Sequence, residues 1–149
     1  MARRFFYEKR DKMIKNIVTD QFFLSQKSTP ATIHDQQVII DLIDTLNFHQ
    51  EHCLGMAANM IGVLKNIIII KEGKDNLIML NPQILKTYGH IYTAQEGCLS
   101  HIGMKSVKRF EKIKVSYEDL NMRKKVKTYS GLTAQIIQHE IDHCRGILI

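Results

Sequence analysis

The stretch His139-Glu140-Ile141-Asp142-His143 carries more information about this chain than any other segment. On a helix, residues four apart lie on one face about 6 Å apart along the axis, so both imidazoles can bind one metal ion. Glu140 follows the first imidazole and can then reach a water molecule on that metal as a proton acceptor. The same pattern also occurs by chance, as an ordinary polar stripe on an amphipathic helix. This segment alone does not distinguish a metal site from a polar stripe, so other parts of the sequence are needed to choose between the two interpretations.

A third metal ligand is expected upstream of this helix, because the sequence ends at Ile149, soon after His143. Cys144 is a poor candidate, since its side chain points about 100° around the helix from its neighbour His143. His49 and His52 have a spacing that suits a metal, but they lie at the polar end of an expected helix, where histidines facing solvent are common.

Cys98 is the better upstream candidate. It lies in the segment Glu96–Ser100, where Gly97 allows the backbone to bend tightly beside a thiolate. One Cys and two His leave a fourth coordination position open, which is the arrangement of catalytic rather than structural zinc sites.

Length and composition favour one domain over residues 1–149, large enough to bury a core without disulfides. Its three cysteines are widely spaced, which is typical of free thiols or metal ligands in a reducing compartment. The basic start lacks the apolar run of a secretory signal, and the aliphatic block Ile67–Ile70 is too short to cross a bilayer. We therefore expect a cytoplasmic protein that does not bind membranes.

The net charge of +6 is compatible with a partner rich in RNA, such as the ribosome. The basic residues gather near the N-terminus and between Lys105 and Lys127. A solvated basic face is the simpler interpretation, because the chain has neither zinc-finger spacing nor an aromatic RNA-binding signature. Specific DNA binding is not expected.

The hydrophobic pattern predicts an α+β domain in which short strands gather around a late helix. Ser130 and Gly131 are placed to open this final helix, and Gly146 is placed to end it. The other expected elements are a helix over 35–51 and strands over 63–71, 77–80, 112–117 and 125–129.

Three segments together resemble the peptide deformylase family. They are the Gln-His-Glu-x-x-His helix at Gln138–His143, the Glu-Gly-Cys-Leu-Ser segment at Glu96–Ser100, and a degraded Gly-φ-Gly-φ-Ala-Ala-x-Gln motif at Cys53–Met60. The resemblance covers roughly residue 35 to the end and leaves residues 1–34 as an N-terminal extension of unknown role. It implies a peptide-deformylase-like fold, with small antiparallel sheets around a central C-terminal helix that binds the metal.

This resemblance also implies a function. Cys98, His139 and His143 would bind one divalent metal, with Fe²⁺ expected and Zn²⁺, Ni²⁺ or Co²⁺ able to substitute. The metal would activate water for attack on the formyl group of N-formylmethionyl peptides, giving formate and a free N-terminal Met. Glu140 would take the proton of the water and pass it to the leaving amine.

The family's substrate contacts carry over to further positions. The backbone N–H of Leu99 would stabilise the oxyanion, together with the Gln side chain that usually closes the first motif. Leu54, Ile136 and His139 match positions that line the methionine pocket, and Gly55 matches a backbone contact to the substrate.

Neighbouring polar residues have expected roles too. Gln138 and Asp142 are candidates for orienting the histidines, although Asp142 is equally well explained as an ordinary polar residue of a partly exposed helix. Glu96 is expected to pair with Arg109 in a structural role.

Two substitutions depart from the family pattern. Met60 replaces the Gln, and a thioether has no N–H to donate to an oxyanion. Cys53 replaces the first Gly and is best read as a small buried side chain. Two alternatives to a deformylase therefore stay open. One is a deformylase-like amidohydrolase for another N-acyl substrate, and the other is a catalytically weak metal-binding module associated with the ribosome.

Overall fold

The computed structural model describes residues 12–149 and has an α+β fold, as the sequence pattern predicts. A five-stranded antiparallel sheet has the strand order β1-β2-β3-β4-β5, so each strand pairs with the next in the chain. The elements are α1 (Gln21–Leu24), η2 (Ile33–Asp35), α2 (Gln36–Phe48), β1 (Gly55–Ala57), η3 (Ala58–Ile61), β2 (Ile67–Glu72), β3 (Asp75–Gly97), β4 (Met104–Glu118), β5 (Lys124–Ser130) and α3 (Gly131–Cys144).

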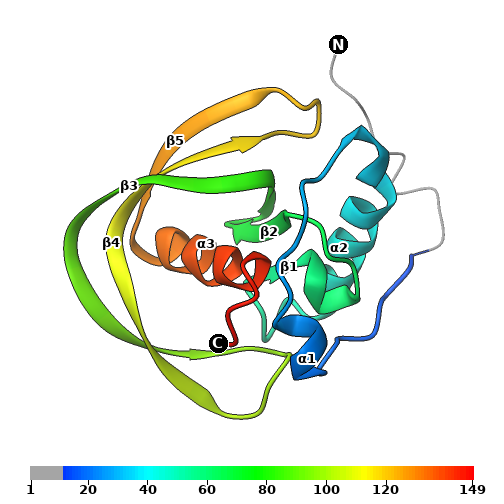
Figure 1. Ribbon diagram of the computed structural model, residues 1–149, viewed down its shortest axis with the longest axis horizontal. Coiled ribbons are helices and arrows are strands. Elements are labelled where there is room, and N and C mark those ends of the chain that lie inside the picture. The colour runs from blue at the N-terminus through cyan, green and yellow to red at the C-terminus, as the bar shows by residue number, and fades with distance from the viewer. Residues whose placement is uncertain (1–11) are drawn as a thin grey trace.

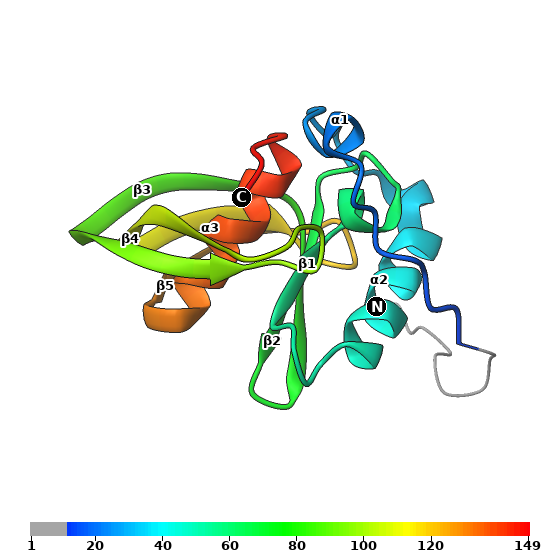
Figure 2. The ribbon, with the colours of Figure 1, turned by 90° about the horizontal axis from the view of Figure 1, so that it is seen from below.

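The C-terminal helix α3 lies inside the curve of the sheet. Figure 1 shows β3, β4 and β5 bending around α3, while α2 lies on the other side of β1 and β2. In Figure 2, which is turned by 90°, the long β3–β4 pair extends away from α2 with α3 beside it. The antiparallel arrangement around a central C-terminal helix is the one expected, and its strands are joined in one sheet.

Strand β2 is buried on both faces, which explains its uninterrupted isoleucine run. Ile68 and Ile70 pack in one cluster with Ile137 and Ile141 of α3. Ile67 and Ile69 pack in a second cluster with Leu42 and Leu46 of α2. All four β2 isoleucines are fully buried, and full burial of such a side chain contributes about 1.5–3 kcal/mol. Strand β2 thus fixes both helices to the sheet.

Helix α2 is shorter than the expected span of 35–51, because η2 precedes it and its last turn ends at Phe48. The preceding η2 starts with a capping box in which the side chains of Thr32 and Asp35 each bond the backbone of the other, and η2 continues directly into α2.

Strand β3 is much longer than the expected strand over 77–80. The expected end at Leu80 is wrong, because the pairing with β4 shifts register between Leu80 and Gln83 and then continues. Asn81 adopts a positive φ of 52° in this irregularity, and a bulge tolerates a proline that cannot donate to the ladder. For β4, the expected strand over 112–117 covers only the later part of the strand, which begins at Met104.

The boundaries of α3 confirm the turn residues expected from the sequence. Ser130 precedes the helix, Gly131 has a positive φ of 63°, and Gly146 follows the helix with a φ of 75°. A Cβ at Gly146 would collide with the carbonyl group of Ser25. Only glycine fits this position, because both its φ and the close backbone forbid a side chain.

The described part of the N-terminal segment packs against the elements that carry the sequence motifs. The Val18 N–H donates to the Met60 carbonyl at 2.8 Å, and the Ser28 N–H donates to the Cys144 carbonyl at 2.9 Å. The basic residues Arg3, Arg4, Lys9 and Arg10 lie outside the described residues. Over residues 12–149, the helices are too short or too polar to span a membrane. A single domain over 1–149 stays a prediction.

Candidate functional site

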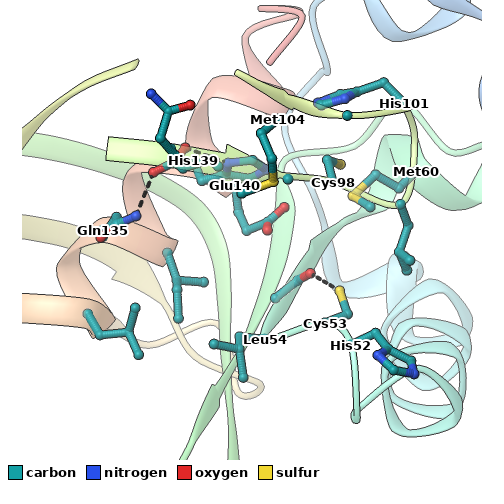
Figure 3. A pocket seen from close by; sticks show the side chains of 18 residues that line it. His52, Cys53, Leu54, Met60, Cys98, His101, Met104, Gln135, His139 and Glu140 are labelled. Atoms are coloured by element: carbon teal, nitrogen blue, oxygen red, sulfur yellow. Dashed lines mark hydrogen bonds and ion pairs between the residues drawn. The ribbon is translucent and has the colours of Figure 1, made fainter. Parts of the chain in front are cut away.

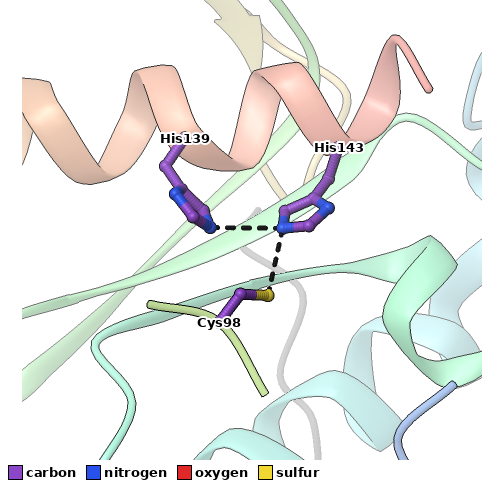
Figure 4. Close-up of side chains that lie close together, drawn as sticks. All are labelled: Cys98, His139 and His143. Atoms are coloured by element: carbon purple, nitrogen blue, oxygen red, sulfur yellow. Dashed lines mark hydrogen bonds between the residues drawn. The ribbon is translucent and has the colours of Figure 1, made fainter. Parts of the chain in front are cut away.

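Three potential metal ligands converge where the end of β3 meets α3. His139 and His143 lie on one face of α3, and Cys98 follows β3 directly opposite them (Figure 4). The two Nε2 atoms are 3.2 Å apart, and Cys98 Sγ lies 3.3 Å from His143 Nε2. All three donor atoms lie within 4.8 Å of one another.

These separations fit a tetrahedral metal ion. With metal–nitrogen bonds near 2.05 Å and a metal–sulfur bond near 2.3 Å, the edges of the tetrahedron are about 3.3 Å between nitrogens and about 3.6 Å between sulfur and nitrogen. The observed nitrogen–nitrogen spacing and the sulfur–nitrogen spacing to His143 are close to these values, and all three donors lie within 4.8 Å of one another, so they can share one ion. Three protein ligands leave the fourth position for water or substrate.

Glu96 fixes the orientation of the first histidine. Its Oε1 lies 2.8 Å from His139 Nδ1, which leaves Nε2 of the ring directed toward the other ligands. Arg109 donates to both oxygens of Glu96, at 2.7 and 3.0 Å, and also to Asp142 at 2.7 Å. The Gln135 amide donates to Glu96 at 2.9 Å. Burial alone would raise the pKa of Glu96, but bonds to His139 and Arg109 lower it to about 2.

The expectation that Gln138 orients a histidine is wrong. Its amide group donates to the carbonyl groups of Phe110 and Ala134, and its Oε1 accepts from the Phe110 N–H at 2.9 Å. Gln138 therefore joins α3 to β4. Asp142 is linked to the histidines only through Arg109 and Glu96. The expected pair of Glu96 and Arg109 is present, and through His139 it also belongs to the site.

The second histidine remains neutral near neutral pH. Burial, followed by the charges of His139 and His101, lowers the pKa of His143 to about 3. A neutral imidazole keeps a lone pair for a metal. His101 lines the same pocket as Cys98 and His139.

Glu140 is buried beside these ligands, and its atom Oε1 has no hydrogen-bond partner within the described chain. Burial raises the pKa of Glu140 to about 7. Gly55 in β1 makes room for this carboxyl group, since a Cβ there would lie 3.0 Å from Glu140 Oε2 and 2.7 Å from Ile136 Cγ2. An unpaired buried carboxyl group that can hold or release a proton is suited to acid–base chemistry.

A pocket of about 590 Å³ opens next to Cys98, His139 and Glu140 (Figure 3). The structure brings all of the sequence-predicted contact residues to this pocket, although they come from three separate segments. They are Leu54, Gly55, Met60, Leu99 and Ile136.

Other pocket residues did not emerge from the motifs. Leu132 and Gln135 precede His139 on the same helix, and their helical spacing from it is a signal that could have found them. His101 and Met104 come from the β3–β4 connection and the start of β4, where no periodicity points to the pocket.

The two residues that depart from the family motif both lie at the pocket wall. Cys53 is half-buried, and its thiol donates to the Gly55 carbonyl at 2.8 Å. Burial and the charge of Glu140 raise the pKa of Cys53 to about 12, so it remains a thiol. Met60 is almost completely buried, in η3, and presents its thioether to the pocket.

Curated relatives of the chain are peptide deformylases. One from Clostridium beijerinckii is 53% identical over 137 residues, which span 92% of this chain and 100% of that protein. Peptide deformylase 1 of a Nostoc species is 35% identical over 130 residues, spanning 83% of this chain and 68% of that protein.

Solved structures show the same fold. The crystal structure of a peptide deformylase from Synechococcus elongatus in complex with actinonin has a TM-score of 0.83 at 33% identity, and the match covers 99% of this chain and 83% of that one. A Met-Ala-Ser-bound class I type b peptide deformylase from Acinetobacter baumannii has a TM-score of 0.82 at 26% identity, with 92% of this chain and 97% of that chain covered.

The family model described as polypeptide deformylase matches residues 14–149. This match includes most of the segment 1–34, which we expected to lie outside the family resemblance. The converging ligands, the buried glutamate, the fold and the relatives agree: the chain belongs to the peptide deformylase family.

Proposed function

We propose that Cys98, His139 and His143 bind one divalent metal ion and that Glu140 transfers protons beside it. Hydrolysis of the formyl amide of N-formylmethionyl peptides, to formate and a free N-terminal Met, is the activity of the metal-dependent family to which the chain belongs. The observation that carries our assignment of residues is the spacing of 3.2 and 3.3 Å among the three donors, with Glu140 beside them at the pocket.

The bound metal supplies a Lewis acid that lowers the pKa of water and polarises the formyl group. A thiolate and two imidazoles suit Fe²⁺, Zn²⁺, Ni²⁺ and Co²⁺. Fe²⁺ is the ion that we propose for the native enzyme, with the other three as functional substitutes.

Glu140 takes a proton from the attacking water and returns it to the nitrogen of the leaving peptide. A catalytic group works best with a pKa near the working pH, since it then accepts and donates with similar ease. Burial brings the pKa of Glu140 to about 7 and so prepares it for both steps.

The pocket walls hold the substrate. Leu54, Leu132 and Ile136 give the pocket an apolar side that suits an unbranched thioether side chain. The backbone of Gly55 in β1 contacts the substrate backbone, and the Leu99 N–H, in the turn after Cys98, donates to the oxygen of the formyl group.

Met60 is the observation that favours a slower or altered enzyme. Loss of one oxyanion donor costs about 100- to 1,000-fold in rate. The same residue, together with Cys53, supports a second candidate, a related amidohydrolase for another N-acyl group. A catalytically weak metal-binding module on the ribosome is the third candidate.

A basic surface supports docking to the ribosome, within the cytoplasm. Lys86 lies directly opposite Lys114 in the β3–β4 pair, and both Lys86 and Lys112 lie over the ring of Tyr88. Like charges opposite each other destabilise a sheet, and an anionic partner would relieve that repulsion. Binding to membranes or to specific DNA is not part of the proposal.

The test is formate release from formyl-Met-Ala-Ser by the protein loaded with Fe²⁺ under exclusion of oxygen, or with Ni²⁺ or Co²⁺. Release should require the metal and should disappear in Glu140→Ala. Acetyl-Met-Ala-Ser is the matched substrate, and a preference for acetyl over formyl would support the second candidate. Binding of metal and ribosomes without any turnover would favour the third.

A further inference from the structure

The side chain of His101 is a polar group in the pocket that no assignment above uses. Both ring nitrogens are buried, and neither has a hydrogen-bond partner among the described residues. His101 nevertheless lines the pocket next to Cys98 and Leu99. A buried polar group without a partner is uncommon in folded proteins, and a role at a functional site is one explanation for it.

Most other polar side chains of the pocket already have partners. The amide of Gln95 donates to Ser106, that of Gln135 donates to Glu96, and the thiol of Cys53 donates to Gly55. Among the pocket side chains that the structure describes, only Glu140 and His101 have buried polar atoms without a partner. Glu140 has a role in proton transfer, and His101 is left without one.

His101 is held on the side of the pocket where a donor is missing. Its backbone N–H donates to the Cys98 carbonyl at 3.3 Å, so a tight turn fixes His101 relative to the metal ligand. Figure 3 shows the His101 ring on the same side of the pocket as Cys98 and Met60, with Glu140 facing them. The turn also contains Leu99, whose N–H is the backbone donor proposed above.

We propose that His101 supplies the side-chain hydrogen bond that Met60 cannot, donating to the oxygen of the substrate's formyl group as negative charge develops on it. This inference rests on the proposed function. Either neutral tautomer of imidazole has one N–H to donate, whereas a thioether has none. No bond to His101 forms or breaks, so the proton transfers remain with Glu140.

His101→Phe removes the donor and keeps a ring of similar size. We expect kcat for formyl-Met-Ala-Ser to fall about 10- to 1,000-fold with little change in KM, because the bond strengthens only in the transition state. Metal content and melting temperature should be unchanged. Ile102→Ala is the matched control, since it truncates the next side chain of the same loop, which is fully exposed.

Met60→Gln separates this role from a structural one. In the His101→Phe protein, the restored amide should recover most of the lost kcat, because it supplies a donor again. In the protein that retains His101, the same substitution should change kcat by less than about tenfold, since one donor is already present. A large increase in kcat on Met60→Gln in the protein that retains His101 would mean that His101 does not donate to the formyl oxygen, and it would overturn the proposal.

A binding measurement covers the case in which His101→Phe does not fold or loses its metal. Formate, the product, is added to the metal-loaded protein with ¹⁵N-labelled histidine, and the ring signals of His101 should shift on titration. His101→Asn, which retains an amide donor, should keep more activity than the Phe variant.

Failure of the inference is distinct from failure of the proposed function. If the protein releases formate and His101→Phe is as active, or if Met60→Gln does not rescue it, His101 is not the donor. An absence of His101 shifts at saturating formate leads to the same conclusion. If the unmodified protein loaded with metal releases no formate, the function itself is wrong.

Discussion

Glu96 Oε1 lies 2.8 Å from His139 Nδ1, and this contact joins the second sequence motif to the third. The neighbouring Cys98 is itself a proposed ligand, so one short segment both binds the metal and orients another ligand. Arg109 holds the carboxylate from the other side at 2.7 and 3.0 Å. The geometry of the proposed metal site therefore depends on a buried ion pair outside the three ligands.

Glu96→Gln should weaken metal binding while leaving the three ligands in place. Loss of such a supporting carboxylate typically lowers metal affinity or activity about 10- to 100-fold. The rate of metal loss to a chelator measures the effect. Glu111→Gln is the control, because Glu111 is exposed on β4 and its carboxylate accepts a hydrogen bond from the His90 N–H. Equal rates of metal loss in both variants would contradict this role of Glu96.

Glu140→Gln should abolish proton transfer without releasing the metal. Acid–base catalysis by a positioned carboxyl group contributes about 100- to 10,000-fold, so kcat should fall by that factor. The amide is close in size to the carboxyl group and fits the same buried space. Metal content by elemental analysis should match that of the unmodified protein, and loss of metal in this variant would make Glu140 a ligand instead.

Gly55→Ala should reduce activity through a steric effect. The new methyl group would lie 2.7 Å from Ile136 Cγ2 and 3.0 Å from Glu140 Oε2, so the glutamate or β1 must move. We expect a lower kcat and a lower melting temperature. Adding Ile136→Ala removes the contacting Cγ2 atom and should restore part of the melting temperature. No recovery in the double variant would place the strain elsewhere.

Cys53 and Cys144 should resist alkylation near neutral pH. Burial, with the charge of Glu140, raises the pKa of each thiol to about 12, and the thiolate is the form that reacts. Raising the pH toward 12 should therefore increase their labelling. Cys98 is only half-buried and should become reactive when a chelator removes the metal. Iodoacetamide labelling followed by peptide mass spectrometry measures the order in which the cysteines react. Labelling of Cys53 before Cys98 in the metal-free protein would contradict the prediction.

Some elements could be predicted from the sequence because the residues that indicate them are neighbours in the chain. The spacing of His139 and His143 on one helix, the glycines at both ends of α3, and the alternation that led to the β4–β5 pair could all be recognised from neighbouring residues. The family motifs predicted roles for Cys98, Glu140 and the pocket contacts, and these residues line one pocket. The full length of β3 was not predicted. Asn and Pro are typical of strand ends, but at Asn81 and Pro82 the strand only shifts its register and then continues to pair with β4.

The sequence by itself thus predicted the ligands and the proton-transfer residue that we propose, and it contains the substitution at Met60. Tertiary structure decided which polar groups are satisfied. Gln138 bonds β4 rather than a histidine, Gln135 bonds Glu96, and His101 is left with two buried unpaired nitrogens. The physical reason is that a hydrogen bond depends on distance and direction between segments far apart in the chain, which residue type and local spacing do not specify.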